Sequence, residues 1–237
     1  MAAQPVPVVF IPALLCDAAM YQEVIGILGS AIDAQVMLSP KSRLEDSVAD
    51  ILARAPATFV LVGTSYGGNL ALEVALAAPE RVTALWLMGC NPAAPQAGGP
   101  DLAGGLRANP TAVFNMLAGL VVNQQATAAA ATFLAMAQRV GGAAGAEQAQ
   151  AVAARRQTLD RLEALRMPAL LVWGEQDALV PHAAGLALAS GLPNAAFHLL
   201  SDCGHLPTLE KPAQSAALFS GLLQRLTESA DSAEGVS

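Results

Sequence analysis

The chain is 237 residues long, enough for one α/β domain with a sizeable core, and its formal net charge is −7. Hydrophobic residues make up 54% and charged residues 13%, which excludes a disordered chain, and the negative charge with only two lysines excludes nucleic acid and anionic lipid as partners. No run approaches the roughly 20 apolar residues of a membrane-spanning helix, so the apolar surplus fits either a large core or a subunit interface.

Apolar runs typical of buried strands alternate with amphipathic stretches over the first 90 residues. We expect strands at 6–11, 35–38, 58–63 and 82–88, and helices at 19–28, 44–54 and 68–78. Continuous apolar strands separated by helices are typical of a parallel sheet that is covered on both faces.

This alternation stops after residue 90 and returns near residue 167. Ala-rich helical segments between Gly and Pro clusters fill the interval, without a convincing strand. Strands at 169–173 and 196–200 and helices at 182–190 and 212–226 then follow. The sequence therefore predicts an α/β core at 1–90 and 167–227, a helical insertion at 91–166 and a disordered acidic tail at 228–237.

A G-x-S-x-G pattern at residues 63–67 stands between a predicted strand and a predicted helix. A serine on such a sharp turn presents its Oγ at the carboxyl edge of a parallel sheet. The glycines let strand and helix approach closely, and the free N–H groups at the helix start can stabilise an oxyanion. We therefore interpret Ser65 as a nucleophile.

Three motifs occur in one order along the chain: GTSYGG at 63–68, WGEQD at 173–177 and CGH at 203–205. With them the chain resembles the α/β-hydrolase superfamily, in its small single-domain branch of serine hydrolases and esterases with a helical lid. The resemblance covers all but the tail and the variable insertion. It implies a mostly parallel twisted sheet with helices on both faces, a nucleophile elbow at Ser65 and a lid at 91–166.

A base and an acid complete the predicted triad. His205 follows the last predicted strand, at the edge expected for Ser65, whereas His182 is expected to be solvated and His198 to be a wall or core residue. Asp177 fits the family order Ser, Asp, His and is preferred as the acid. Asp202 is the alternative acid, but because it stands so close to His205 in sequence we expect it to cap the turn through backbone N–H groups.

The predicted oxyanion hole has two backbone donors. One is the N–H of Tyr66, and the resemblance places the other in the loop after the first strand, where counting back from an aromatic at Tyr21 gives Leu14. Ala13 stands where relatives have glycine, so a positive φ there would strain and displace the loop. Cys16 in the same loop is read as a small apolar filler rather than a nucleophile.

Apolar side chains of the insertion are expected to line a pocket for a small or medium apolar acyl group. The candidates are Phe114, Leu117, Phe133 and Met136. A substrate carboxylate held by Arg107 or Arg139 is left open.

The favoured function is hydrolysis of a carboxylic ester through an acyl-enzyme on Ser65, that is, a carboxylesterase-like activity. Fold and triad alone leave open a C–C hydrolase, thioesterase, acyl transferase or lyase, as well as a ligand-binding protein on a hydrolase scaffold. Dehalogenase and epoxide-hydrolase chemistry is disfavoured, because those relatives carry aspartate at the position of Ser65.

The triad needs no metal or organic cofactor. We expect a small-molecule substrate. Because the sequence shows no signal peptide and no disulfide framework, we expect a cytoplasmic location.

Overall fold

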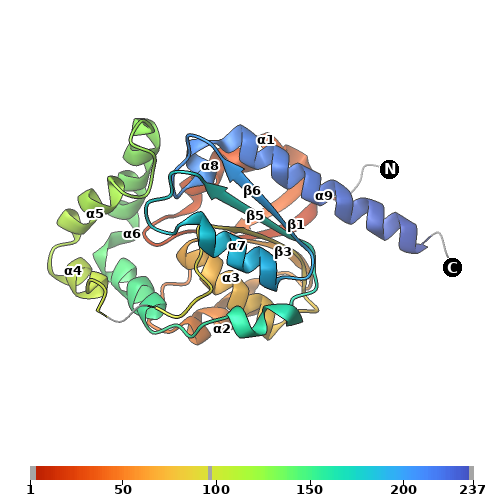
Figure 1. Ribbon diagram of the computed structural model, residues 1–237, viewed down its shortest axis with the longest axis horizontal. Coiled ribbons are helices and arrows are strands. Elements are labelled where there is room, and N and C mark those ends of the chain that lie inside the picture. The colour runs from red at the N-terminus through yellow and green to blue at the C-terminus, as the bar shows by residue number, and fades with distance from the viewer. Residues whose placement is uncertain (1–3, 96–97, 235–237) are drawn as a thin grey trace.

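The computed structural model describes residues 4–95 and 98–234, with side chains through residue 228, and contains a six-stranded sheet between helices (Figure 1). Every strand pair is parallel, in the order β2-β1-β3-β4-β5-β6. The strands are β1 Val6–Ile11, β2 Ile32–Val36, β3 Phe59–Thr64, β4 Val82–Met88, β5 Ala169–Gly174 and β6 Ala195–Leu200. The predicted α/β fold with a parallel sheet is confirmed.

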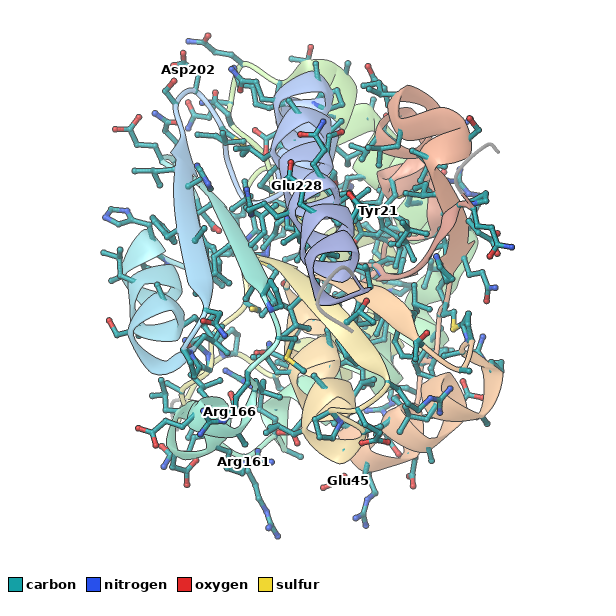
Figure 2. The ribbon with its side chains drawn as sticks, turned by 90° about the vertical axis from the view of Figure 1, so that its right-hand side faces the viewer. Tyr21, Glu45, Arg161, Arg166, Asp202 and Glu228 are labelled. Atoms are coloured by element: carbon teal, nitrogen blue, oxygen red, sulfur yellow. The ribbon has the colours of Figure 1, made fainter. Side chains whose placement is uncertain are left out.

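Helices cover both faces of the sheet, and the insertion adds further ones. The helices are α1 Gln22–Leu28, α2 Leu44–Arg54, α3 Tyr66–Ala77, α4 Leu102–Ala108, α5 Pro110–Ala118, α6 Thr127–Ala153, α7 His182–Gly191, α8 Pro207–Glu210 and α9 Pro212–Glu234, with 3-10 turns η1 Ala18–Met20, η2 Gly29–Ala31 and η3 Leu159–Ala164. Figure 2 shows Tyr21 and Glu228 on the side of α1 and α9, and Glu45 and Arg161 on the opposite side, where α2 and α3 pack.

The strands contribute to two separate layers of core. Val8 and Phe10 of β1 pack with one layer and Val9 and Ile11 with the other, because successive side chains of a strand point to opposite faces. On the α9 side, Phe219 stacks on Trp86 with ring centroids 4.6 Å apart, which docks α9 onto the sheet. Each large apolar side chain buried in this way contributes about 1.5–3 kcal/mol.

Two predicted boundaries are wrong. β2 begins at Ile32 rather than residue 35, because an edge strand with one exposed face can contain Asp33 and Gln35 and so lacks the continuous apolar run. The segment predicted as a disordered tail is helical through Glu234, because α9 continues past residue 227 without a proline or glycine to end it. Residues 235–237 lie outside the described part.

The chain between β4 and β5 forms α4, α5 and α6, which lie beyond the carboxyl ends of the strands (Figure 1), and then η3, which packs against α7 and is joined to α3 through Arg161 and Glu73. The backbone of α6 is broken at Gly141, where φ is 81° and ψ is 159°, so two helical halves meet at a kink. Nowhere in the described residues is a helix long and apolar enough to cross a membrane.

Candidate active site

Ser65 lies on the sharp turn from β3 to α3, with φ 56° and ψ −116°. Its N–H donates to the carbonyl of Met88 at 2.8 Å, which joins the turn to the end of β4. A Cβ on Gly63 would collide with the Gly67 carbonyl, and one on Gly67 with the Ile11 carbonyl. The turn therefore tolerates no side chain at positions 63 and 67. Its backbone strain of roughly 1–3 kcal/mol must be offset by the surrounding packing.

Asp177 and His205 form a buried hydrogen-bonded pair. The distance from His205 Nδ1 to Asp177 Oδ2 is 2.7 Å, and the two side chains are only 2% and 1% exposed. The other carboxylate oxygen, Oδ1, accepts from the N–H groups of Leu179 and Val180, each at 2.9 Å. Because an ionised carboxylate can only accept a hydrogen bond, Asp177 favours the neutral imidazole that carries its proton on Nδ1. Nε2 of His205 is then left as an acceptor.

The structure brings this pair to the same edge as Ser65. A Cβ on Gly89, directly after β4, would meet ring atoms of His205 at 2.8 and 2.9 Å. Gly89 adjoins Met88, whose carbonyl accepts from the Ser65 N–H. The imidazole therefore packs on the backbone beside the serine turn, and the three predicted triad residues lie at one edge of the sheet, at the carboxyl ends of β3, β4 and β5.

The other acid and histidines lie elsewhere. Asp202 is exposed with φ 50°, and no described group donates a hydrogen bond to its carboxylate, so it does not cap the turn as expected. His182 is exposed at the start of α7. His198, expected to be a wall or core residue, is exposed, because β6 is an edge strand.

The turn that carries His205 is held by two side chains that the sequence does not single out. Glu210 Oε2 accepts from the N–H of Gly204 at 2.8 Å, and its Oε1 accepts from Leu206 at 3.1 Å. Gln176, next to Asp177 in sequence, accepts from the N–H of Cys203 at 2.8 Å. Hydrogen bonds to a carboxylate are the stronger kind, so Glu210 is the main brace of this turn.

The two segments that carry the predicted oxyanion donors pack closely together. Tyr66 lies in the first turn of α3, where N–H groups have no acceptor within the helix. The loop after β1 abuts this turn, because a Cβ on Gly67 would also meet the carbonyl of Pro12. The N–H of Leu14 in that loop has no acceptor among the described residues.

The strain expected at Ala13 falls on another residue. Ala13 has no positive φ, whereas Leu15 has φ 63°. Ala13 is buried, and its carbonyl accepts from the N–H of Cys16 at 3.0 Å, which closes a turn. The residue of the loop with a left-handed backbone is therefore Leu15, two positions after Ala13, where the strain was expected.

The predicted pocket residues belong to the inserted helices α5 and α6, and all four are buried. Phe114, Leu117, Phe133 and Met136 belong to one apolar cluster with Leu15. The two arginines considered for a substrate carboxylate are both engaged. The guanidinium of Arg107 donates to Glu147 and Gln150, and Arg139 forms a two-bond ion pair with Asp17.

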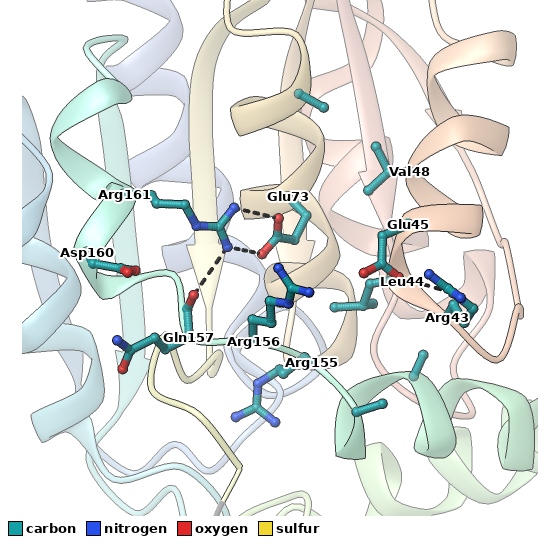
Figure 3. A pocket seen from close by; sticks show the side chains of 13 residues that line it. Arg43, Leu44, Glu45, Val48, Glu73, Arg155, Arg156, Gln157, Asp160 and Arg161 are labelled. Carbon is teal, nitrogen blue, oxygen red and sulfur yellow. Dashed lines mark hydrogen bonds and ion pairs between the residues drawn. The ribbon is translucent and has the colours of Figure 1, made fainter.

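A surface cavity of about 890 Å³ lies on the α2 and α3 face, away from the triad (Figure 3). Part of its charged lining is paired within itself, because Arg161 donates to both oxygens of Glu73 and Arg43 lies beside Glu45. None of the predicted pocket residues lines it.

The three cysteines are buried free thiols. Burial raises the pKa of Cys90 to about 12 and also raises the pKa values of Cys16 and Cys203. A neutral thiol is a poor nucleophile, which supports the reading of Cys16 as a packing residue.

Among curated proteins, the 2-hydroxy-6-oxononadienedioate/2-hydroxy-6-oxononatrienedioate hydrolase of Paraburkholderia phymatum is 34% identical over 162 residues, covering 61% of this chain and 55% of that protein. The 2-hydroxymuconate semialdehyde hydrolase of Pseudomonas sp. strain CF600 is 31% identical over 186 residues, covering 69% and 61%. The matches thus span little more than half the length of these relatives.

Solved structures show the same fold at low identity. An esterase from Thermogutta terrifontis has a TM-score of 0.82 at 20% identity, covering 94% of this chain and 91% of that one. The enol-lactonase from Burkholderia xenovorans LB400 has a TM-score of 0.83 at 17% identity, covering 94% and 92%. A model of the alpha/beta hydrolase family matches residues 29–218. The chain belongs to the alpha/beta hydrolase family.

Proposed function

We propose that this hydrolase cleaves a carboxylic ester of a small or medium, uncharged acyl group through an acyl-enzyme on Ser65. The observation that carries the proposal is the buried Asp177–His205 hydrogen bond beside the strained turn of Ser65. A nucleophile, a base and a group that orients the base are the parts that acyl transfer requires.

In the proposed reaction, His205 Nε2 takes the proton of Ser65 Oγ as this oxygen attacks the ester carbonyl carbon. The N–H groups of Leu14 and Tyr66 stabilise the resulting oxyanion, and Asp177 stabilises the imidazolium. His205 then gives its proton to the departing alcohol, which leaves the acyl group on Ser65. Water, activated by the same imidazole, attacks the acyl-enzyme and releases the acid and free Ser65.

We also propose that residues 91–166 form a lid over this site. The insertion contacts both loops that flank Ser65. The N–H of Asn123 donates to Glu210 at 2.8 Å, and a Cβ on Gly204 would meet the backbone of Val122. On the other side, α6 bonds to the loop after β1.

The buried side chains of the insertion favour an uncharged acyl group. Phe114, Leu117, Phe133 and Met136 are apolar, and the buried polar side chains of the described residues include no arginine or lysine. A carboxylate taken into such surroundings would need a cationic partner. The proposal includes a small-molecule substrate and a cytoplasmic location, which both stay predictions.

A second candidate is hydrolysis of a C–C bond, favoured by the curated relatives, whose names are those of hydrolases acting on a dioate and on a semialdehyde. The same serine, histidine and aspartate can serve this bond. None of the described arginine or lysine side chains is fully buried, which favours the ester over a dioate.

The test is turnover of p-nitrophenyl esters of increasing acyl length beside a 2-hydroxy-6-oxo-dienedioate, with Ser65→Ala and with Ser190→Ala as the control. Ser190 is exposed, and among the described residues its hydroxyl bonds only to the carbonyl of Leu186 in its own helix. We expect ester turnover that Ser65→Ala abolishes and Ser190→Ala leaves unchanged. Turnover of the dioate alone would favour C–C hydrolysis. No turnover, with Ser65 inert to a fluorophosphonate, would favour a ligand-binding protein.

A further inference from the structure

Gln148 is a buried amide in the second half of α6, with only 1% of its surface exposed. Its Oε1 accepts from the backbone N–H of Leu15 at 3.0 Å, although the two residues are 133 positions apart. A buried polar side chain is tolerated when it is hydrogen-bonded, so this contact accounts for a glutamine at that position.

The partner of Gln148 is the residue with the unusual backbone in the loop after β1. Leu15 has φ 63°, a conformation that a side chain such as leucine rarely adopts without support. Its side chain is buried against Gly145, where an added Cβ would collide with Leu15 Cδ2. Gly145 and Gln148 are three positions apart and share one face of α6, so the helix holds both the side chain and the N–H of Leu15.

This contact determines which N–H of the loop remains available. The N–H of Leu15 is taken by Gln148, that of Cys16 by the Ala13 carbonyl and that of Asp17 by Met136 Sδ at 3.5 Å. The N–H of Leu14 precedes these and has no described acceptor. Because the peptide units on either side of Leu14 share its Cα, fixing the Leu15 N–H limits the direction of the Leu14 N–H.

The first half of α6, which precedes the kink at Gly141, contacts the same loop. Arg139 Nε donates to Asp17 Oδ2 at 2.7 Å and its Nη2 donates to Oδ1 at 3.1 Å. This ion pair is partly exposed, whereas the Gln148 contact is buried, so the second half of α6 supplies the firmer constraint.

We infer that Gln148 is a positioning residue that aims the Leu14 N–H at the oxyanion and thereby couples the inserted helices to catalysis. The inference rests on the proposed function. Gln148 touches no reacting atom, so its loss should lower transition-state stabilisation while substrate binding changes little.

The test compares Gln148→Met, which keeps the volume but removes the acceptor, with Gln150→Met two positions away. Gln150 is exposed and bonds to Arg107 on the surface. We expect Gln148→Met to lower kcat on a p-nitrophenyl ester about 10- to 100-fold with KM within threefold, since removing an oxyanion donor costs about 10²- to 10³-fold and displacing one costs less. Affinity for an alkyl trifluoromethyl ketone, whose tetrahedral adduct places an oxyanion in the hole, should fall by the same factor.

A folded Gln148→Met with kcat and ketone affinity within twofold of wild type, or an equal loss in Gln150→Met, would overturn the inference. If Gln148→Met does not fold, Gln148→Asn, whose amide is too short for the contact, replaces it with the same expectation. If the wild type hydrolyses no ester, the proposed ester hydrolysis fails by itself. The rate of fluorophosphonate labelling of Ser65 is then measured instead, because the phosphonyl oxygen needs the same N–H groups. An unchanged labelling rate in Gln148→Met, or no labelling of the wild type, overturns the inference.

Discussion

The two loops that flank Ser65 are held in place by different parts of the chain. The turn that carries His205 is braced from within the core, by Glu210 a few residues later and by Gln176 next to Asp177. The loop after β1 is braced by α6 of the insertion, through Gln148 and Arg139 more than 100 positions away. The acid and base are thus secured by the core, whereas the proposed oxyanion side depends on the insertion.

This difference separates two kinds of functional defect. A change in the core brace should disturb proton transfer and the stability of the domain together, because His205 and Asp177 are buried in the packed edge. A change at Gln148 or Arg139 in α6 should lower the stabilisation of the oxyanion and leave the His205–Asp177 hydrogen bond in place.

The largest effect is expected at the acid–base pair itself. Asp177→Asn should lower kcat roughly 10³- to 10⁴-fold, because the amide no longer stabilises the imidazolium and can favour the wrong tautomer. Steady-state ester hydrolysis measures this, with Asp202→Asn as the control, since Asp202 is exposed on the neighbouring turn. Equal losses in the two variants would remove Asp177 from its proposed role.

A smaller effect is expected at Glu210, the brace of the His205 turn. Glu210→Ala leaves the N–H groups of Gly204, Leu206 and Asn123 without their acceptor, so the free energy of unfolding should fall by about 1–3 kcal/mol and kcat about 10-fold. Denaturant unfolding and ester turnover measure the two quantities. Glu210→Gln, which keeps an acceptor oxygen, should recover part of both; no recovery would mean that shape rather than hydrogen bonding matters there.

The smallest effect is expected at the ion pair of Asp17 with Arg139. Burial opposes ionisation of Asp17, but hydrogen bonds from Arg139 and the Ala19 N–H lower its pKa below the ordinary 3.8. A carboxyl with a lowered folded pKa stabilises the fold fully above its ordinary pKa, and this contribution is lost as pH falls through the folded value.

The Asp17→Asn variant should therefore differ from wild type by at most about 1 kcal/mol at pH 7, since the pair is partly exposed, and by less at pH 3. Urea unfolding at several pH values measures the difference. A stability difference between Asp17→Asn and wild type that grows toward acid pH would contradict a lowered pKa of Asp17.

The sequence predicts the elements with local signals. The apolar strands, the G-x-S-x-G turn and the positions of Asp177 and His205 at strand ends follow from periodicity, glycine spacing and the resemblance. Gln148 and Glu210 carry no such signal, because a polar residue in an Ala-rich helix or near a helix start is typical of a solvated surface. Their roles depend on which loop the tertiary fold brings against them.

The same reason explains the misplaced strain in the loop after β1. A left-handed conformation at Leu15 cannot be inferred from its residue type, since leucine ordinarily avoids it. It is stabilised by contacts with α6 that are visible only in the folded chain.

The most direct test of the central claim is the site of covalent labelling by a fluorophosphonate, mapped by peptide mass spectrometry in wild type, Ser65→Ala and His205→Ala. We expect one label per chain on the peptide that contains Ser65, no label in Ser65→Ala and a strongly slowed reaction in His205→Ala. A label on another residue, or a rate unaffected by the loss of His205, would contradict a Ser65 nucleophile activated by the buried pair.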